Sequence, residues 1–102
     1  MDAEQLQKKI RNVNEKQSRK LNLKNSKLNY LPSEIGILKN LEEIDIENNF
    51  IKKLPPEFRN LQGLKIFSAT RNAFREIPLD IFFLSQLEVL DIKENFINTI
   101  PT

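Results

Sequence analysis

Residues 41–51 read LEEIDIENNFI, and their pattern of apolar residues with one asparagine returns twice at a fixed interval. The interval is 23 residues, since 64 − 41 = 23 and 87 − 64 = 23. The equivalent residues are Leu41, Ile44, Ile46, Asn49 and Ile51; Leu64, Phe67, Ala69, Asn72 and Phe74; and Leu87, Leu90, Ile92, Asn95 and Ile97. One interval earlier, the same positions hold Ser18, Leu21, Leu23, Ser26 and Leu28. A repeat of this length predicts a solenoid, in which each unit buries an apolar face against the next.

Each unit has two halves with different periodicities. In the first half Ile44 and Ile46 alternate with charged residues, which is typical of a short strand with one buried face. Strands that repeat in the same sense must lie parallel, joined by right-handed crossovers. The second half opens on a Leu-Pro or Ile-Pro pair, at Leu31-Pro32, Leu54-Pro55, Ile77-Pro78 and Ile100-Pro101. Because proline removes a backbone donor and fixes φ, this half predicts short 3₁₀ turns on the convex side.

The residues before the repeats predict a helix over residues 2–16. An apolar stripe runs along it through Ala3, Leu6, Ile10 and Val13, and Asp2 with Gln5 fits a capping box. The first unit of a solenoid has no neighbour on one side, so residues 1–17 are expected to cap it. The polar outer face would carry Lys8, Lys9, Arg11 and Lys16. The repeats then occupy residues 18–102, as units 18–40, 41–63 and 64–86 and a partial unit 87–102.

Asn49, Asn72 and Asn95 sit where each strand ends and the chain bends inward. A side-chain amide offers two donors and an acceptor, so a column of asparagines can satisfy the buried backbone groups at these bends. We therefore interpret them as structural residues rather than ligand contacts.

The spacing LxxLxLxxNxLxxLPxxIxxLxxL resembles that of leucine-rich repeat proteins. The 23-residue length with Leu-Pro in the variable half is similar to the intracellular, Ras-suppressor-type class. Residues 41–61 fit this spacing at every position, whereas Phe67, Ala69, Ser18 and Ser26 depart from it. The resemblance implies an α/β solenoid with a parallel sheet on its concave face. It also implies an adaptor without enzymatic activity, which binds a protein partner through that face.

The outward strand positions define the expected concave face. In one interpretation its charges form solvated ladders between neighbouring units, such as Arg19 with Glu42 and Lys20 with Glu43. In the other, an acidic patch and a less charged centre contact the protein partner. The patch comprises Glu43, Asp45 and Glu47, and the centre comprises Ile66, Ser68, Thr70 and Val89, ringed by Arg71, Asp91 and Lys93.

The last unit supports an alternative function. It stops at Thr102, before a convex half, so its apolar residues would leave an open edge: Leu87, Leu90, Ile92, Ile97 and Ile100. Either further repeats are missing from the sequence, or the chain associates with a second copy through this edge. Self-association would also use an apolar patch formed by Phe82, Phe83 and Phe96.

The composition narrows the remaining function classes. Cysteine and histidine are both absent, so nucleophilic cysteine, histidine acid–base catalysis and the usual zinc ligand sets are not expected. No cofactor or metal site is expected, and the absence of disulfides favours a cytoplasmic protein. Residues 1–27 carry a net charge of +5 and residues 28–102 one of −3, which sum to +2. This basic third could attract phosphates or acidic lipid, but without interleaved aromatic residues it favours neither nucleic acid nor membrane as partner.

Overall fold

A computed structural model describes residues 1–98 of the chain; Ile100 and Pro101 of the fourth unit lie outside this range. Four short strands form one parallel sheet in the order β1-β2-β3-β4. They span β1 Lys20–Asn22, β2 Glu43–Asp45, β3 Ile66–Ser68 and β4 Val89–Asp91. Their register pairs Lys20 with Glu43, Glu43 with Ile66, and Ile66 with Val89. Each coil therefore lies directly on the one before it, and the predicted solenoid is confirmed.

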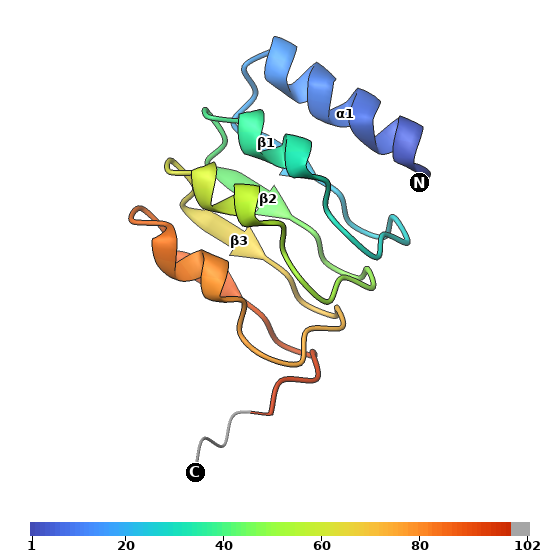
Figure 1. Cartoon of the computed structure of the whole chain (residues 1–102), viewed down its shortest axis with the longest axis vertical. Helices are drawn as coiled ribbons and strands as arrows, with labels where there is room; N and C mark the ends of the chain where they lie inside the picture. Colours follow the sequence, from blue (N-terminus) through green and yellow to red (C-terminus); the bar gives the residue numbers. More distant parts are fainter. Residues whose placement is uncertain (99–102) are drawn as a thin grey trace.

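The second half of each coil forms a five-residue 3₁₀ helix immediately after its proline. These helices are η1 Ser33–Ile37, η2 Pro56–Asn60 and η3 Leu79–Phe83. Figure 1 shows them stacked in one column, with the strands stacked in another. At Gly36 the column is tight, since a Cβ there would lie 2.9 Å from Glu57 Cβ and 3.0 Å from its carbonyl oxygen. The predicted 3₁₀ turns are thus confirmed as the layer opposite the sheet.

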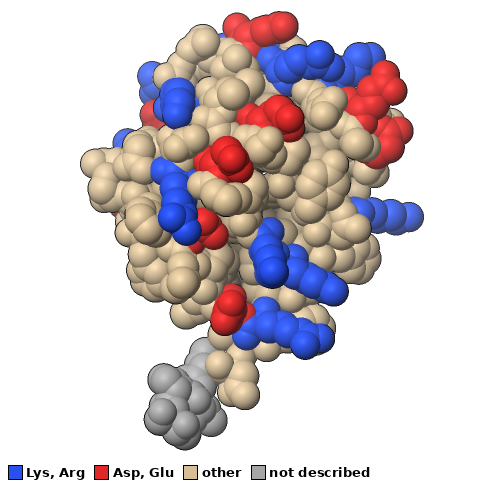
Figure 2. All heavy atoms as spheres, viewed as in Figure 1, with Lys and Arg blue, Asp and Glu red and all other residues tan. Residues whose placement is uncertain are grey.

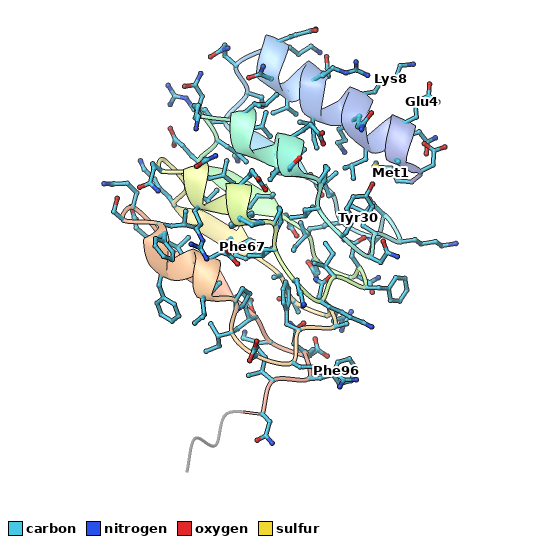
Figure 3. The ribbon with its side chains drawn as sticks, in the orientation of Figure 1. Met1, Glu4, Lys8, Tyr30, Phe67 and Phe96 are labelled. Carbon is cyan, nitrogen blue, oxygen red and sulfur yellow. The ribbon has the colours of Figure 1, made fainter. Side chains whose placement is uncertain are left out.

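The core lies between these two layers. Ile44 and Phe67 occupy the same position in successive coils and are fully buried. Phe58 of η2 packs on Phe67, which is labelled in Figure 3, with 5.0 Å between their ring centroids. Phe74 is buried as well. At about 1.5–3 kcal/mol per buried large side chain, this stacking drives folding.

Helix α1, Ala3–Glu15, covers the first coil. The capping box forms as predicted: Gln5 N–H donates to Asp2 Oδ1 at 2.8 Å, and Asp2 N–H donates to Gln5 Oε1 at 2.9 Å. Leu6, Ile10 and Val13 are buried. Within the described residues, no helix is both long enough and apolar enough to cross a membrane.

Two details of the predicted helix were wrong. Ala3 is exposed, although the start of the chain stays against the first coil, where the Met1 ammonium group donates to the Ser26 carbonyl at 3.0 Å. Lys9 does not belong to the outer face; its ammonium group donates to the Asn22 carbonyl at the edge of β1. Lys8, Arg11 and Lys16 do lie exposed. The helix therefore covers the side chains of the first coil and also satisfies a backbone acceptor of its edge strand.

The asparagine column is present as predicted. Asn72 Nδ2–H donates to the Ile46 carbonyl at 2.9 Å and to the Ala69 carbonyl at 3.1 Å, while its Oδ1 accepts from Ile51 N–H at 3.1 Å. Asn49 and Asn95 make equivalent contacts one coil away on either side. These side chains hydrogen-bond the backbone where the strands end, which confirms their structural role.

The fourth coil is less buried than the others. Leu87, Leu90 and Ile92 are only partly buried, although the equivalent residues of the third coil are completely covered. An open hollow of about 450 Å³ lies along this side of β4. Over the described residues, β4 is therefore an edge strand with an apolar face beside it.

Candidate functional site

The first two strands carry a ladder of ion pairs on the concave face. Glu42 lies 3.6 Å from Arg19 and 3.8 Å from Lys65, and Lys24 lies 3.5 Å from Asp45 and 3.7 Å from Glu47. Lys20 and Glu43 approach to 4.0 Å. The ladder interpretation is confirmed for this half of the sheet. The acidic patch of Glu43, Asp45 and Glu47 is therefore largely matched by lysines of the first coil, and each exposed pair contributes about 0–1 kcal/mol.

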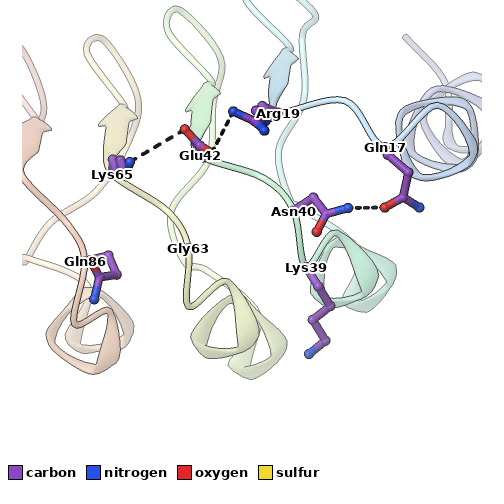
Figure 4. Close-up of a pocket in the computed structure, with 8 residues that line it drawn as sticks. All are labelled: Gln17, Arg19, Lys39, Asn40, Glu42, Gly63, Lys65 and Gln86. Carbon is purple, nitrogen blue, oxygen red and sulfur yellow. Dashed lines mark hydrogen bonds and ion pairs between the residues drawn. The ribbon is translucent and has the colours of Figure 1, made fainter.

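An open polar hollow of about 500 Å³ lies beside this ladder (Figure 4). Arg19, Glu42 and Lys65 line one side, and Gln17 and Asn40 are hydrogen-bonded on the other. Gly63 lies between the equivalent residues Asn40 and Gln86, so the missing side chain leaves this space open. Glu42 bridges Arg19 and Lys65, and Lys39 is a third cation in the wall, so the hollow is polar with an excess of positive charge.

The other half of the concave face is less charged. Ile66 and Val89 are paired neighbours in β3 and β4, at the position where β1 and β2 carry Lys20 and Glu43. Val89 is 49% exposed, and Ile66, Ser68 and Thr70 are partly exposed. Arg71 bonds Glu94 at 3.0 Å, and Lys93 lies 3.9 Å from Asp91. The structure thus brings the predicted uncharged centre together and places its charged ring along one border.

Asp45 and Asp91 also have a local role that the sequence interpretation missed. Asp45 Oδ1 accepts the backbone N–H of Glu47 at 2.9 Å, and Asp91 Oδ1 accepts that of Lys93 at 3.1 Å. Asn22 makes the same contact with Lys24. The signal was present in the sequence, because Asn and Asp share this position in three units and favour such turns. These side chains therefore stabilise the turn at the end of each strand, and this structural role does not depend on a binding partner.

The turn at Asp91 lowers the pKa of its carboxyl group below the ordinary value. The main cause is the hydrogen bond from Lys93 N–H, and the Thr70 side chain and the Lys93 charge act in the same direction. A lowered pKa means that folding favours the ionised carboxylate. This contribution is complete above the ordinary pKa of an aspartate and is lost as the pH falls through the lowered value.

The structure does not bring the three predicted self-association residues together. Phe82 and Phe83 belong to η3, which lies on the left in Figure 1. Phe96 lies on the opposite side of the molecule, on the lower right in Figure 3. Phe83 lies under the Arg59 guanidinium, 4.2 Å from its ring centroid, and so faces the preceding coil. Phe82 is the residue of its coil that is equivalent to Arg59 in the preceding coil. Arg59 contacts the next coil through an ion pair with Asp80. The single aromatic patch was therefore wrong, because the residues occupy different columns of the coil.

Comparison with known proteins agrees with this architecture. The family model described as Leucine Rich Repeat matches residues 40–61. A solved leucine-rich repeat protein of Leptospira interrogans superposes with a TM-score of 0.68 at 34% sequence identity, over 72% of this chain. The chain is a leucine-rich repeat protein. The matched region amounts to 19% of the length of the Leptospira protein. No curated protein gives a significant sequence match to this leucine-rich repeat chain.

Leucine-rich repeat domains are generally protein-interaction folds. The repeats supply a regular surface, and the residues that differ from coil to coil give that surface its individual character. Within the described residues, no group of three or more metal-ligating side chains gathers at one place. The residues that vary on this chain's sheet are therefore the first place to look for a function.

Proposed function

We propose that this leucine-rich repeat protein is an interaction module that binds a protein partner through the β3–β4 half of its concave face. The observation that carries the proposal is the adjacent pair Ile66 and Val89 on the exposed surface of the sheet. Interface centres are depleted in charge and surrounded by polar residues. Here Asp91, Lys93 and Arg71 supply that border, with the ion-paired Glu43, Asp45 and Glu47 on the other side. The cytoplasmic location expected from the sequence stays a prediction.

A substitution at Val89 tests this proposal. Val89→Arg places a charge in the uncharged centre, and we expect it to reduce capture of the partner from lysate by about tenfold. The control is Leu79→Arg, which adds the same charge at an exposed apolar residue on the convex helix η3. Quantitative mass spectrometry of the captured proteins compares the two variants with the wild type. Retention by Val89→Arg together with loss by Leu79→Arg would place binding on the convex side and overturn the proposal.

Self-association through the edge of β4 is a second candidate. In the preceding coil, Ala69 N–H donates to the Asp91 carbonyl and Arg71 N–H to the Lys93 carbonyl. The equivalent donors are those of Ile92 and Glu94, and no strand among residues 1–98 accepts from them. An edge with free donors and partly exposed Leu87, Leu90 and Ile92 suits pairing with a second copy.

Light scattering coupled to size exclusion tests this second candidate. If the edge pairs two copies, the wild type gives a dimer mass that falls to the monomer mass on dilution, because association follows mass action. Leu90→Glu puts a charge on the edge and should give a monomer throughout. Val89→Arg, on the concave surface beside the edge, reports any contribution of that surface. A wild-type monomer at every concentration excludes self-association.

A further inference from the structure

We propose a second binding site for an acidic peptide segment with an apolar or aromatic side chain, on the side of the coil that carries Phe50, Ala73 and Phe96. This side, here called the aromatic flank, follows the asparagine column by one residue in each unit. It is separate from the concave face, and neither the ladders nor the core uses its side chains.

The backbone of the aromatic flank is fixed by the stacking of the coils. Phe50 N–H donates to the Leu28 carbonyl at 2.7 Å, Ala73 N–H to the Ile51 carbonyl and Phe96 N–H to the Phe74 carbonyl, both at 2.9 Å. The same bond in three successive coils holds the three residues in one column. Coils about 4.8 Å apart place Phe50 and Phe96 roughly 10 Å apart, with the small Ala73 between them.

The side chains in this column leave an apolar hollow. Phe50 is 61% exposed and Phe96 is 71% exposed, whereas Phe58, Phe67 and Phe74 are buried. A hollow of about 520 Å³ lies against Phe96 and Ala73, and Lys52, Arg75 and Asn98 complete its wall. Ala73 stands where the neighbouring coils carry phenylalanine, and its small side chain leaves room beside Phe96. A recess with an aromatic wall fits a single inserted side chain, whereas a bilayer requires a flat or protruding apolar surface.

The basic residues of the aromatic flank indicate which charge the bound peptide segment should carry. Over the described residues, no acidic side chain forms an ion pair with Lys52, Lys53 or Arg75, although lysines and arginines of the concave face are paired. Along the sequence, Glu76 is the acidic residue nearest to these three cations, because it follows Arg75 directly. Figure 2 shows basic side chains on the lower right of the molecule, with one acidic side chain beside the lowest of them, and Figure 3 places Phe96 on the same side. Unpaired cations around an apolar recess complement an acidic segment.

The probe for this site is the synthetic peptide Glu-Asp-Glu-Trp-Glu-Asp-Glu labelled with fluorescein. We expect saturable binding to the wild type by fluorescence anisotropy, weakened by added salt because the cations are exposed. Amide chemical shifts should change around Phe50, Ala73 and Phe96. Phe96→Ala and the double variant Lys52→Glu, Arg75→Glu should each weaken binding by about tenfold. These residues are exposed, and an unchanged amide spectrum elsewhere verifies the fold of each variant.

Matched controls separate this site from others. Phe82→Ala removes an equally exposed ring from η3 and should leave peptide binding unchanged. Val89→Arg, which tests the concave face, should also leave it unchanged, so the two proposals can fail independently. The peptide with serine in place of tryptophan should bind about tenfold more weakly. The inference is overturned if the wild type does not bind, if Phe96→Ala binds normally, or if the shifts map to the concave face. Dimer formation, or retention on anionic vesicles, that Phe96→Ala abolishes would identify a different occupant and overturn it as well.

Discussion

Phe67→Ala is expected to lower the free energy of unfolding by about 3–5 kcal/mol. The side chain is fully buried, and its ring packs on Phe58 of η2 across the core. Alanine loses the free energy gained by burying the phenyl ring away from water, and it leaves a cavity. The cavity is hard to close because the coils on both sides are held in place by the strand register. Urea unfolding followed by circular dichroism measures the loss, with the midpoint shift read at constant slope.

Leu90→Ala is the matched control for this prediction. It occupies the same column one coil later, but its side chain is only partly buried at the edge of the described solenoid. Less area is removed from water there, and solvent or neighbouring chain can enter the space, so the loss should be nearer 1–2 kcal/mol. Equal losses for the two variants would contradict the assignment of a covered third coil and an open fourth one.

The sequence was sufficient to predict the coil because one spacing determines several features at once. The 23-residue interval fixed the strand register, the 3₁₀ turns after each proline and the asparagine column. Each of these follows from a side chain that every coil must bury in the same place. A position that repeats without variation is constrained by its neighbours above and below, so its surroundings can be derived from the period alone.

The surfaces were harder to predict because their residues vary between coils. Phe82 and Phe83 are adjacent in sequence, yet Arg59 contacts only Phe83, and this depends on how η2 and η3 stack. Lys9 was assigned to the outer face by helical spacing, but its long side chain reaches the Asn22 carbonyl. From the sequence alone Phe96 was assigned to a patch with Phe82 and Phe83, because the sequence could not show which side of the coil each ring occupies or which cations lack acidic neighbours. Such pairings depend on three-dimensional contacts between different units.

The asparagine column gives the second large prediction. Asn72→Ala is expected to reduce the free energy of unfolding by about 2–4 kcal/mol. Its Oδ1 is the acceptor for the buried Ile51 N–H, which has no other partner in the structure. The Ile46 and Ala69 carbonyls lose one donor each but keep another, from Asn49 and Asn95 respectively. The orphaned Ile51 N–H therefore accounts for most of the loss, which urea unfolding measures.

The shared carbonyl makes neighbouring asparagines interdependent. When Asn49→Ala and Asn72→Ala are combined, the Ile46 carbonyl loses both of its side-chain donors, at 2.8 and 2.9 Å. The double variant should then lose about 1–2 kcal/mol more than the sum of the single losses. Asn49 and Asn95 share no acceptor, so that pair of alanine substitutions should be additive within about 0.5 kcal/mol. Additivity of both pairs would show that each asparagine acts alone, because a shared buried acceptor cannot lose its last donor without a further cost.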